Sequence, residues 1–214
     1  MRAILFDWDG TIVDSIQMLF ETDAAICRQI GVPFDEAIFR RTFSPNWRLM
    51  YRLLGIPEER TDEAVGVWAT TFRSDQTRPF PGVTEALIRL AGAGFRLGIV
   101  TGGSRAEVEP QLARLGIDAL LTVRVYGNDA VAGKPDPRPL HMALELAGAT
   151  PVEAIYVGDA LDDMRMAAAA GVRGVGIVSK IAEAEELIAA GAVESAGSVV
   201  DWVDRLLTAA PPEA

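Results

Sequence analysis

The stretch Ala3-Ile4-Leu5-Phe6-Asp7-Trp8-Asp9-Gly10-Thr11 decides how the rest of the chain is interpreted. Its four apolar residues, Ala3–Phe6, predict a buried strand, and two aspartates follow that strand at once. Ionised aspartates are almost never buried without a partner, so their charge must be compensated. A divalent cation is the simplest candidate, because Mg²⁺ binds a few carboxylate oxygens and leaves positions open for phosphate oxygens.

The length and composition indicate a folded protein with a sizeable core. The chain has 214 residues, of which 50% are apolar and 23% are charged. This size fits one large domain or a domain with an insertion. No apolar run reaches the ~18–20 residues of a membrane span. Because Asp7 follows the N-terminus too soon for a signal peptide, we expect a cytoplasmic protein without a membrane partner.

The charge and the rare residues exclude several classes of function. A net charge of −10 argues against sequence-independent binding of nucleic acid, which requires clustered Lys and Arg. Cys27 is the only cysteine, so we expect no intrachain disulfide and a place for Cys27 in core packing. His141 is the only histidine, which argues against a Ser-His-Asp triad or a His-built zinc site. We expect it on a helix face. The acidic composition permits a monomer or a homodimer.

Apolar runs alternate with helical patterns over most of the chain. The expected strands are Ala3–Phe6, Leu97–Thr101, Leu120–Val125, Ala154–Val157 and Val175–Val178. The helical patterns between the later strands are Thr84–Ala93, Arg105–Leu115, Pro139–Ala147 and Asp163–Ala170. This alternation predicts an α/β fold, with a doubly wound, Rossmann-like parallel sheet covered on both faces. In such sheets the ligand lies outside the carboxyl ends of the strands, near a topological switch point.

One stretch, from Ser15 to about Pro79, interrupts this alternation. It contains only helical patterns, at Ile16–Ile30, Asp35–Phe43, Trp47–Leu54 and Asp62–Arg73. We therefore expect a catalytic α/β core made of residues 1–14 and 80–214, with an inserted all-helical cap domain at residues 15–79. The final Pro211–Ala214 is expected to be a frayed tail.

Residues suited to phosphoryl transfer follow the predicted strands. They are Asp7 and Asp9, then Thr101-Gly102-Gly103, then Gly133-Lys134-Pro135-Asp136-Pro137, and finally Gly158-Asp159 with Asp162 and Asp163. One carboxylate can attack phosphorus, and a second can move protons. A hydroxyl, glycine amides and a lysine can hold the phosphoryl oxygens. Magnesium would offset the repulsion between an anionic nucleophile and an anionic substrate.

This set of motifs resembles the haloacid dehalogenase superfamily, specifically its phosphatases with a small helical cap. The relevant branch is that of phosphoglycolate phosphatase and β-phosphoglucomutase. The matching motifs are Asp7–Ser15, Ile99–Arg105, Gly133–Pro137 and Val157–Asp163, which together span almost the whole chain. The resemblance implies a Mg²⁺-dependent phosphatase that hydrolyses a small phosphorylated metabolite through an aspartyl-phosphate.

The resemblance also implies roles for the catalytic and phosphate-binding residues. Asp7 would be the nucleophile and a magnesium ligand. Asp9 would be the general acid/base, with its backbone carbonyl on the metal. Thr101, the Gly102 amide and Lys134 would hold the phosphoryl group.

Two further acids would complete the metal site in this family. Asp159 would ligate magnesium directly, and Asp163 would support the site. We favour Asp163 over Asp162 because the family places its second acid four residues after the first, which is also one helical turn. Trp8 and Ala160 depart from the family pattern. Trp8 puts little of the predicted chemistry in doubt, whereas Ala160 lacks a hydroxyl that would support the metal site.

The lysines and arginines bear on the substrate. Lys134 and Lys180 are the only lysines, so the chain lacks the cap lysine used by family members that cleave phosphonoacetaldehyde. Asp9 argues for phosphate rather than halide chemistry. The cap carries an arginine cluster that includes Arg40, Arg41 and Arg48. One interpretation is a solvated helix face. The other is that an arginine binds a carboxylate on the substrate, as 2-phosphoglycolate would require.

Two alternatives to a phosphatase remain open at this point. A phosphomutase similar to β-phosphoglucomutase would use the same four motifs but return the phosphoryl group to a sugar. A signalling receiver domain, which accepts phosphate without being an enzyme, also gathers acids, a hydroxyl and a lysine at one end of a parallel sheet. A receiver, however, uses an aspartate after its third strand and has no helical insertion after its first.

Overall fold

The computed structural model describes residues 2–129 and 132–209 and contains one six-stranded parallel sheet. The strands are β1 (Ala3–Phe6), β2 (Arg96–Val100), β3 (Leu121–Val125), β4 (Ala154–Gly158), β5 (Arg173–Ile177) and β6 (Glu194–Ala196). Their order is β3-β2-β1-β4-β5-β6. This order is that of a doubly wound sheet, with its switch point between β1 and β4, so the predicted fold class is confirmed. The expected tail, Pro211–Ala214, lies outside the described residues.

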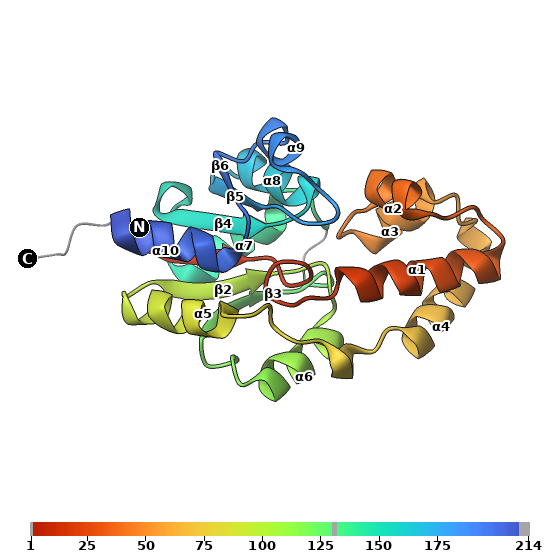
Figure 1. The fold of residues 1–214 in the computed structure, drawn as a ribbon, viewed down its shortest axis with the longest axis horizontal. Helices are drawn as coiled ribbons and strands as arrows, with labels where there is room; N and C mark the ends of the chain where they lie inside the picture. The colour runs from red at the N-terminus through yellow and green to blue at the C-terminus, as the bar shows by residue number, and fades with distance from the viewer. Residues whose placement is uncertain (1, 130–131, 210–214) are drawn as a thin grey trace, which may run out of the picture.

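Helices cover both faces of the sheet (Figure 1). One face packs against α5 (Val83–Gly92), α6 (Arg105–Leu115) and α10 (Val199–Ala209), and the other against α7 (Arg138–Ala147), α8 (Leu161–Ala169) and α9 (Ala184–Ala189). Side chains alternate along a strand, so β1 contributes Ile4 and Phe6 to the first layer and Leu5 to the second. This burial on both sides explains why β1 reads as an unbroken apolar run.

The sequence patterns missed the last three elements, α9, β6 and α10. Strand β6 is only three residues long and begins with the polar pair Glu194-Ser195, so it has no apolar run to reveal it. Helix α10 is amphipathic and buries Trp202, whose ring packs edge-on against Phe6 of β1. The bounds of the predicted strands otherwise differ from the observed ones by one or two residues.

The stretch from Ser15 to Pro79 is helical, as its pattern indicated. It contains α1 (Ile16–Ile30), α2 (Glu36–Thr42), α3 (Trp47–Leu53), α4 (Thr61–Thr71) and two short 3₁₀ turns, Glu58–Arg60 and Ser74–Gln76. These helices share an apolar cluster in which Ile26, Cys27 and Phe39 are buried, and Ala160 and Ile181 of the core extend it. In Figure 1 they lie to the right of the sheet. We propose that residues 15–79 form the cap and that residues 1–14 and 80–214 form the core.

The two connections between cap and core run side by side. The Asp14 N–H donates to the Arg78 carbonyl at 2.9 Å, and the Phe80 N–H donates to the Ile12 carbonyl at 3.0 Å. Both connections leave the core next to β1, so the cap is attached beside the predicted nucleophile. Among the described residues, no helix combines the length and apolarity that a membrane crossing needs. His141 lies on the exposed side of α7, as expected.

Candidate active site

A buried lysine joins two of the predicted acids at the switch point of the sheet. Lys134 Nζ donates to Asp7 Oδ1 at 2.6 Å and lies 2.7 Å from Asp163 Oδ1. The side chains of Lys134, Asp7 and Asp163 are 2%, 5% and 0% exposed, so all three charges are withdrawn from water. Asp7 follows β1 and Asp163 lies on α8, which follows β4. The reversal of strand order between β1 and β4 therefore brings them together.

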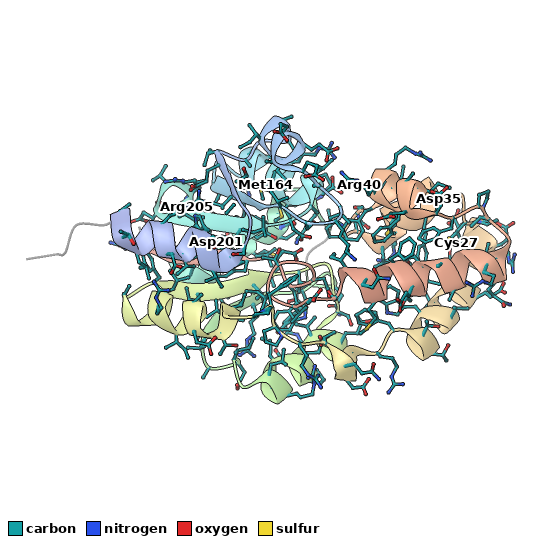
Figure 2. All side chains as sticks on the ribbon, viewed as in Figure 1. Cys27, Asp35, Arg40, Met164, Asp201 and Arg205 are labelled. Atoms are coloured by element: carbon teal, nitrogen blue, oxygen red, sulfur yellow. The ribbon has the colours of Figure 1, made fainter. Side chains whose placement is uncertain are left out.

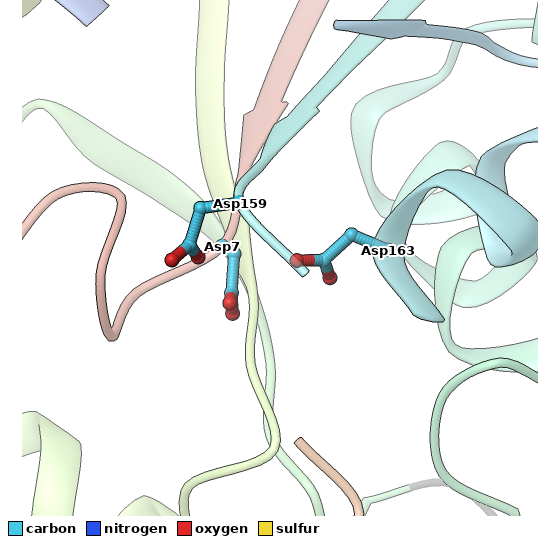
Figure 3. A group of neighbouring side chains, drawn as sticks. All are labelled: Asp7, Asp159 and Asp163. Carbon is cyan, nitrogen blue, oxygen red and sulfur yellow. The ribbon is translucent and has the colours of Figure 1, made fainter. Parts of the chain in front are cut away.

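Asp159 completes a group of three buried carboxylates (Figure 3). Asp7, Asp159 and Asp163 each offer an oxygen, and these oxygens all lie within 4.8 Å of one another. Asp159 Oδ1 accepts a hydrogen bond from the Thr11 hydroxyl at 3.1 Å. Its Oδ2 is buried and has no partner among the described residues. An unpaired carboxylate oxygen beside two other carboxylates fits a hard divalent cation such as Mg²⁺.

Gly10 allows the first motif to pass over Asp159. Its φ of +77° is in the left-handed region that favours glycine. A Cβ atom at this position would also collide with the Asp159 carboxylate. The glycine that directly follows the Asp7–Asp9 pair is therefore required both by the turn and by the acid it covers.

Burial and mutual repulsion raise the pKa values of these acids. Burial, followed by the charge of Asp163, raises the pKa of Asp7 to about 7 although Lys134 opposes the shift. Burial, followed by the charges of Asp7 and Asp163, raises the pKa of Asp159 well above its ordinary value. Lys134 pairs with Asp7 and Asp163, whereas Asp159 has no ion pair among the described residues, so a cation bound beside the three carboxylates would offset their mutual repulsion.

Asp163 and Asp162 have different surroundings. The hydroxyl of Tyr156 lies 3.0 Å from Asp163 Oδ1, and the Ala160 N–H donates to Asp163 Oδ2 at 3.1 Å. Asp162 instead accepts a hydrogen bond from Ser44 of the cap at 2.7 Å. The acid that joins the cluster is thus Asp163, while Asp162 links α8 to the cap.

Asp9 faces a cavity beside the cluster. Its Oδ1 accepts a hydrogen bond from the Ser15 hydroxyl at 2.7 Å, which fixes the orientation of the carboxyl. Burial raises the pKa of Asp9, and the Ser15 hydrogen bond partly opposes that shift. Asp9 and Asp7 line the same cavity of about 390 Å³, called here the nucleophile cavity. The two carboxyls predicted to be the proton donor and the nucleophile therefore line one space.

Thr101 and Gly102 lie where this cavity meets a second one. The second, called here the lysine cavity, has a volume of about 670 Å³ and is lined by Lys134, Thr101 and Gly102. Thr101 and Gly102 also line the nucleophile cavity. The carbonyl of Pro45, in the cap, packs so closely on Gly102 that a side chain at this glycine would collide with it. The cap therefore closes directly over the end of β2.

The structure separates the three cap arginines that the sequence had grouped. Arg48 lines both cavities, and its guanidinium lies 4.3 Å from the centroid of the Trp47 ring. Arg40, labelled in Figure 2, points toward the core, where it pairs with Glu183 at 3.5 Å and Glu186 at 3.0 Å. Arg41 is exposed on α2 and is absent from the described lining of either cavity. Of these three arginines, Arg48 is the one that lines the cavities; Arg52, on the same helix, also lines the lysine cavity.

Sequence reasoning missed several supporting residues. Thr11 and Ser15 belong to the first motif, but only the folded chain shows that they hold Asp159 and Asp9. Tyr156 is a hydroxyl-bearing residue inside an otherwise apolar strand, a signal that could have marked it as a partner of Asp163. Asp23 occupies the buried face of α1 among apolar residues, which is an equally visible irregularity.

The chain matches known proteins over most of its length. Residues 4–177 match the family model described as haloacid dehalogenase-like hydrolase. A pyrophosphatase from Bacillus velezensis is 31% identical over 201 residues, which cover 88% of each chain. A plasmid-encoded phosphoglycolate phosphatase from Cupriavidus necator is 33% identical over 181 residues, covering 79% of this chain and 78% of the relative. A hydrolase structure from Pseudomonas syringae, 25% identical, superposes with a TM-score of 0.87 and covers 99% of this chain and 100% of its own. Because this family model matches residues 4–177, a span that contains all four motifs, the chain belongs to the haloacid dehalogenase-like hydrolase family.

Proposed function

We propose that this protein is a Mg²⁺-dependent phosphatase that hydrolyses a small phosphorylated metabolite through an aspartyl-phosphate on Asp7. The observation that carries the proposal is the buried cluster of Asp7, Asp159 and Asp163 around Lys134, at the switch point of the sheet. Family membership and the phosphatase names of the relatives support a phosphoric monoester hydrolase.

Asp7, Asp159 and Asp163 would hold the metal, together with the backbone carbonyl of Asp9. The unpaired Asp159 Oδ2 supports this assignment, because a buried carboxylate oxygen without a partner is costly. When bound, Mg²⁺ would neutralise the charge of the phosphoryl oxygens and of the attacking carboxylate. Lys134, which contacts Asp7 and Asp163, would supply further positive charge.

The protein's own groups would carry out two successive displacements. A carboxylate oxygen of Asp7 attacks phosphorus, and the bond between phosphorus and the ester oxygen breaks as Asp9 protonates that oxygen. Asp9, now ionised, then takes a proton from a water molecule that attacks the same phosphorus. The bond to Asp7 breaks, and inorganic phosphate leaves. Thr101 and the Gly102 amide would hold phosphoryl oxygens throughout.

The cap would exclude bulk water during these steps. Its contacts with the core include the Ser44–Asp162 hydrogen bond and a hydrogen bond from the Trp68 indole to Glu107 at 3.1 Å. Pro45 on Gly102 closes the cap over the end of β2. A closed cavity protects the aspartyl-phosphate from unproductive reactions and determines which esters reach Asp7.

The substrate is expected to be a small ester, and 2-phosphoglycolate is one candidate. A relative named phosphoglycolate phosphatase and the position of Arg48 support that candidate. The receiver-domain alternative does not fit, because receivers have the strand order 2-1-3-4-5 whereas this sheet has the order 3-2-1-4-5-6.

Phosphate release from a panel of phosphorylated metabolites tests the proposal. We expect Mg²⁺-dependent turnover of p-nitrophenyl phosphate and of at least one metabolite, with loss of activity in EDTA. Activity that persists in EDTA would contradict the mechanism. The phosphomutase alternative predicts instead a long-lived aspartyl-phosphate that transfers its phosphoryl group to an added sugar phosphate, which rapid quenching and product analysis would detect.

A further inference from the structure

A buried carboxyl of the cap faces the nucleophile cavity. Asp23 lies on α1, one helical turn after Leu19, and both residues line the cavity that contains Asp7 and Asp9. Asp23 is only 3% exposed. The mechanism proposed above gives this carboxyl no task, although it opens onto the space in which the substrate would lie.

The described part of the chain offers the Asp23 carboxyl no hydrogen-bond or ion-pair partner. Within residues 2–129 and 132–209, no group donates a hydrogen bond to its carboxyl and no lysine or arginine pairs with it. Burial alone raises its pKa to about 7. A buried carboxyl normally receives hydrogen bonds or a counter-charge, because its desolvation is costly. This one is satisfied only by what enters the cavity.

Apolar side chains and protonated groups surround Asp23; Arg48 lines the same cavity but forms no ion pair with Asp23. The apolar residues of the cavity wall include Leu19, Met50, Val65, Trp68 and Phe72. Burial, then the charge of Asp23, raises the pKa of the Cys27 thiol to about 11, and the same two causes raise the pKa of Tyr51. Both groups therefore stay neutral. Asp7, Asp9 and Glu107 are the other acids that line this cavity.

The cap thus presents two different chemical groups to the nucleophile cavity, the guanidinium of Arg48 and the carboxyl of Asp23. Arg48 is exposed and lines both cavities, whereas Asp23 is enclosed and lines only the nucleophile cavity. A substrate carboxylate placed against Asp23 would meet a like charge in a low-dielectric wall, which is strongly unfavourable. A hydrogen-bond donor placed there would satisfy the carboxyl.

We propose that Asp23 is a specificity-determining residue that accepts a hydrogen bond from an ammonium or hydroxyl group on the non-reacting part of the phosphate ester. The inference rests on the proposed phosphatase function and narrows its substrate class. We therefore expect a higher kcat/KM for small esters that carry a hydrogen-bond donor than for esters of similar size that carry a carboxylate, including 2-phosphoglycolate. A site built to pair with a donor discriminates strongly against analogues that lack it.

Four esters of nearly equal size test this ranking: ethyl phosphate, 2-hydroxyethyl phosphate, 2-aminoethyl phosphate and 2-phosphoglycolate. We expect the wild-type protein to give higher kcat/KM for the hydroxyl or amine ester than for the other two. Asp23→Asn removes the charge but keeps an acceptor oxygen, and Asp23→Leu removes both. If the donor is an ammonium, Asp23→Asn lowers kcat/KM for 2-aminoethyl phosphate by about 10- to 100-fold. If it is a hydroxyl, Asp23→Leu lowers kcat/KM for 2-hydroxyethyl phosphate by about tenfold, and Asp23→Asn does so less.

In both cases kcat/KM for ethyl phosphate should change by less than about threefold. The kcat/KM for 2-phosphoglycolate should rise in both variants, since a repulsive charge is removed. Thr22→Val is the matched control. Thr22 is the neighbouring residue on α1, and its buried hydroxyl also lacks a partner, but it is not among the residues that line the nucleophile cavity. This variant should keep the wild-type ranking. Thermal unfolding of all variants separates a change in selectivity from a loss of fold.

The outcomes distinguish the two proposals. Turnover by the wild-type protein with a ranking that Asp23→Asn and Asp23→Leu leave unchanged would overturn the role of Asp23 alone. A wild-type preference for 2-phosphoglycolate over the donor-bearing esters would also overturn it. The absence of Mg²⁺-dependent turnover of any ester, p-nitrophenyl phosphate included, would instead contradict the phosphatase function itself.

Discussion

The carboxyl-end edge of the sheet and the inner wall of the cap both bury carboxyl groups, but they treat them differently. At the edge, Asp7 and Asp163 share Lys134, and Asp159 is held by Thr11. In the cap, Asp23 has no partner among the described residues. The edge thus gathers three carboxylates beside one lysine, an arrangement suited to a divalent cation. The cap wall leaves a carboxyl for the substrate.

Because of this difference, we expect the edge of the sheet to control the reaction itself and the cap to control which esters react. Residues at the edge follow strands whose positions are set by the sheet, so their geometry is rigid and independent of the ester that binds. Residues on the cap are held by helix packing and cap–core contacts such as Ser44–Asp162. Substitutions at the edge should therefore alter every reaction equally, whereas substitutions in the cap should alter the order of substrates.

The largest expected effect is the loss of turnover in Asp7→Asn. The amide is a poor nucleophile, so kcat for every ester should fall by about 10⁴-fold or more. Phosphate release measures this loss, and circular dichroism checks that the fold is retained. A variant that keeps a few per cent of wild-type activity, or that loses activity on some esters only, would show that the edge does not act on all substrates alike.

The next effect is the loss of stability in Lys134→Met. Removing the lysine leaves Asp7 and Asp163 buried without their counter-charge, which should lower the free energy of unfolding by about 3–5 kcal/mol. Urea denaturation without metal measures the difference. Lys180→Met is the matched control, since Lys180 is exposed, and should change stability by no more than about 0.5 kcal/mol. Equal effects of the two substitutions would contradict a buried charge cluster.

A smaller effect is the pH dependence contributed by Asp23. Its pKa is about 7 in the folded protein and close to 3.8 in the unfolded chain, so the folded state binds the proton more tightly. The resulting stabilisation is complete below about pH 4 and is lost as the pH rises to about 7, by at most about 4 kcal/mol. Relative to Asp23→Asn, the wild-type protein should therefore lose stability over this range.

Urea denaturation of both proteins at several pH values measures that difference. Glu107 is present in both proteins, so its contribution to the free energy of unfolding cancels in the difference between them. Cys27 and Tyr51 remain protonated throughout this pH range. Parallel stability curves for the wild-type protein and Asp23→Asn would show that the Asp23 carboxyl is solvated as freely in the folded state as in the unfolded one.

The smallest effects separate Arg48 from Arg40. Arg48→Ala should raise KM for 2-phosphoglycolate by about three- to tenfold more than KM for p-nitrophenyl phosphate, since a guanidinium beside the cavity attracts a carboxylate. Arg40→Ala removes only partly exposed ion pairs and should cost about 0–1 kcal/mol of stability, with no change in the order of substrates. Equal effects of the two substitutions on KM would mean that the cap arginines act only through long-range electrostatic attraction of the anionic substrate.

Much of the fold was predictable because β1 and its neighbours carry a strong local signal. An apolar run buried on both faces and followed by Asp7 and Asp9 is readable from consecutive residues. Strand β6 was not predictable, because three residues that begin with Glu194 become a strand only by pairing with β5. The roles of Arg40 and Arg48 could not be separated either, since that depends on which element lies opposite each side chain.

Local patterns in the sequence were enough to establish the α/β class, the helical nature of residues 15–79 and the set of residues that follow the strands, because strand alternation, helical periodicity and motif order are local properties. Long-range packing was needed to show that Asp163 contacts Lys134 while Asp162 contacts Ser44, and that Asp23 lines the nucleophile cavity with no partner among the described residues. Those facts depend on which groups far apart in the chain come within hydrogen-bond distance, and on which are withdrawn from water. Both are set by the packing of the cap against the sheet.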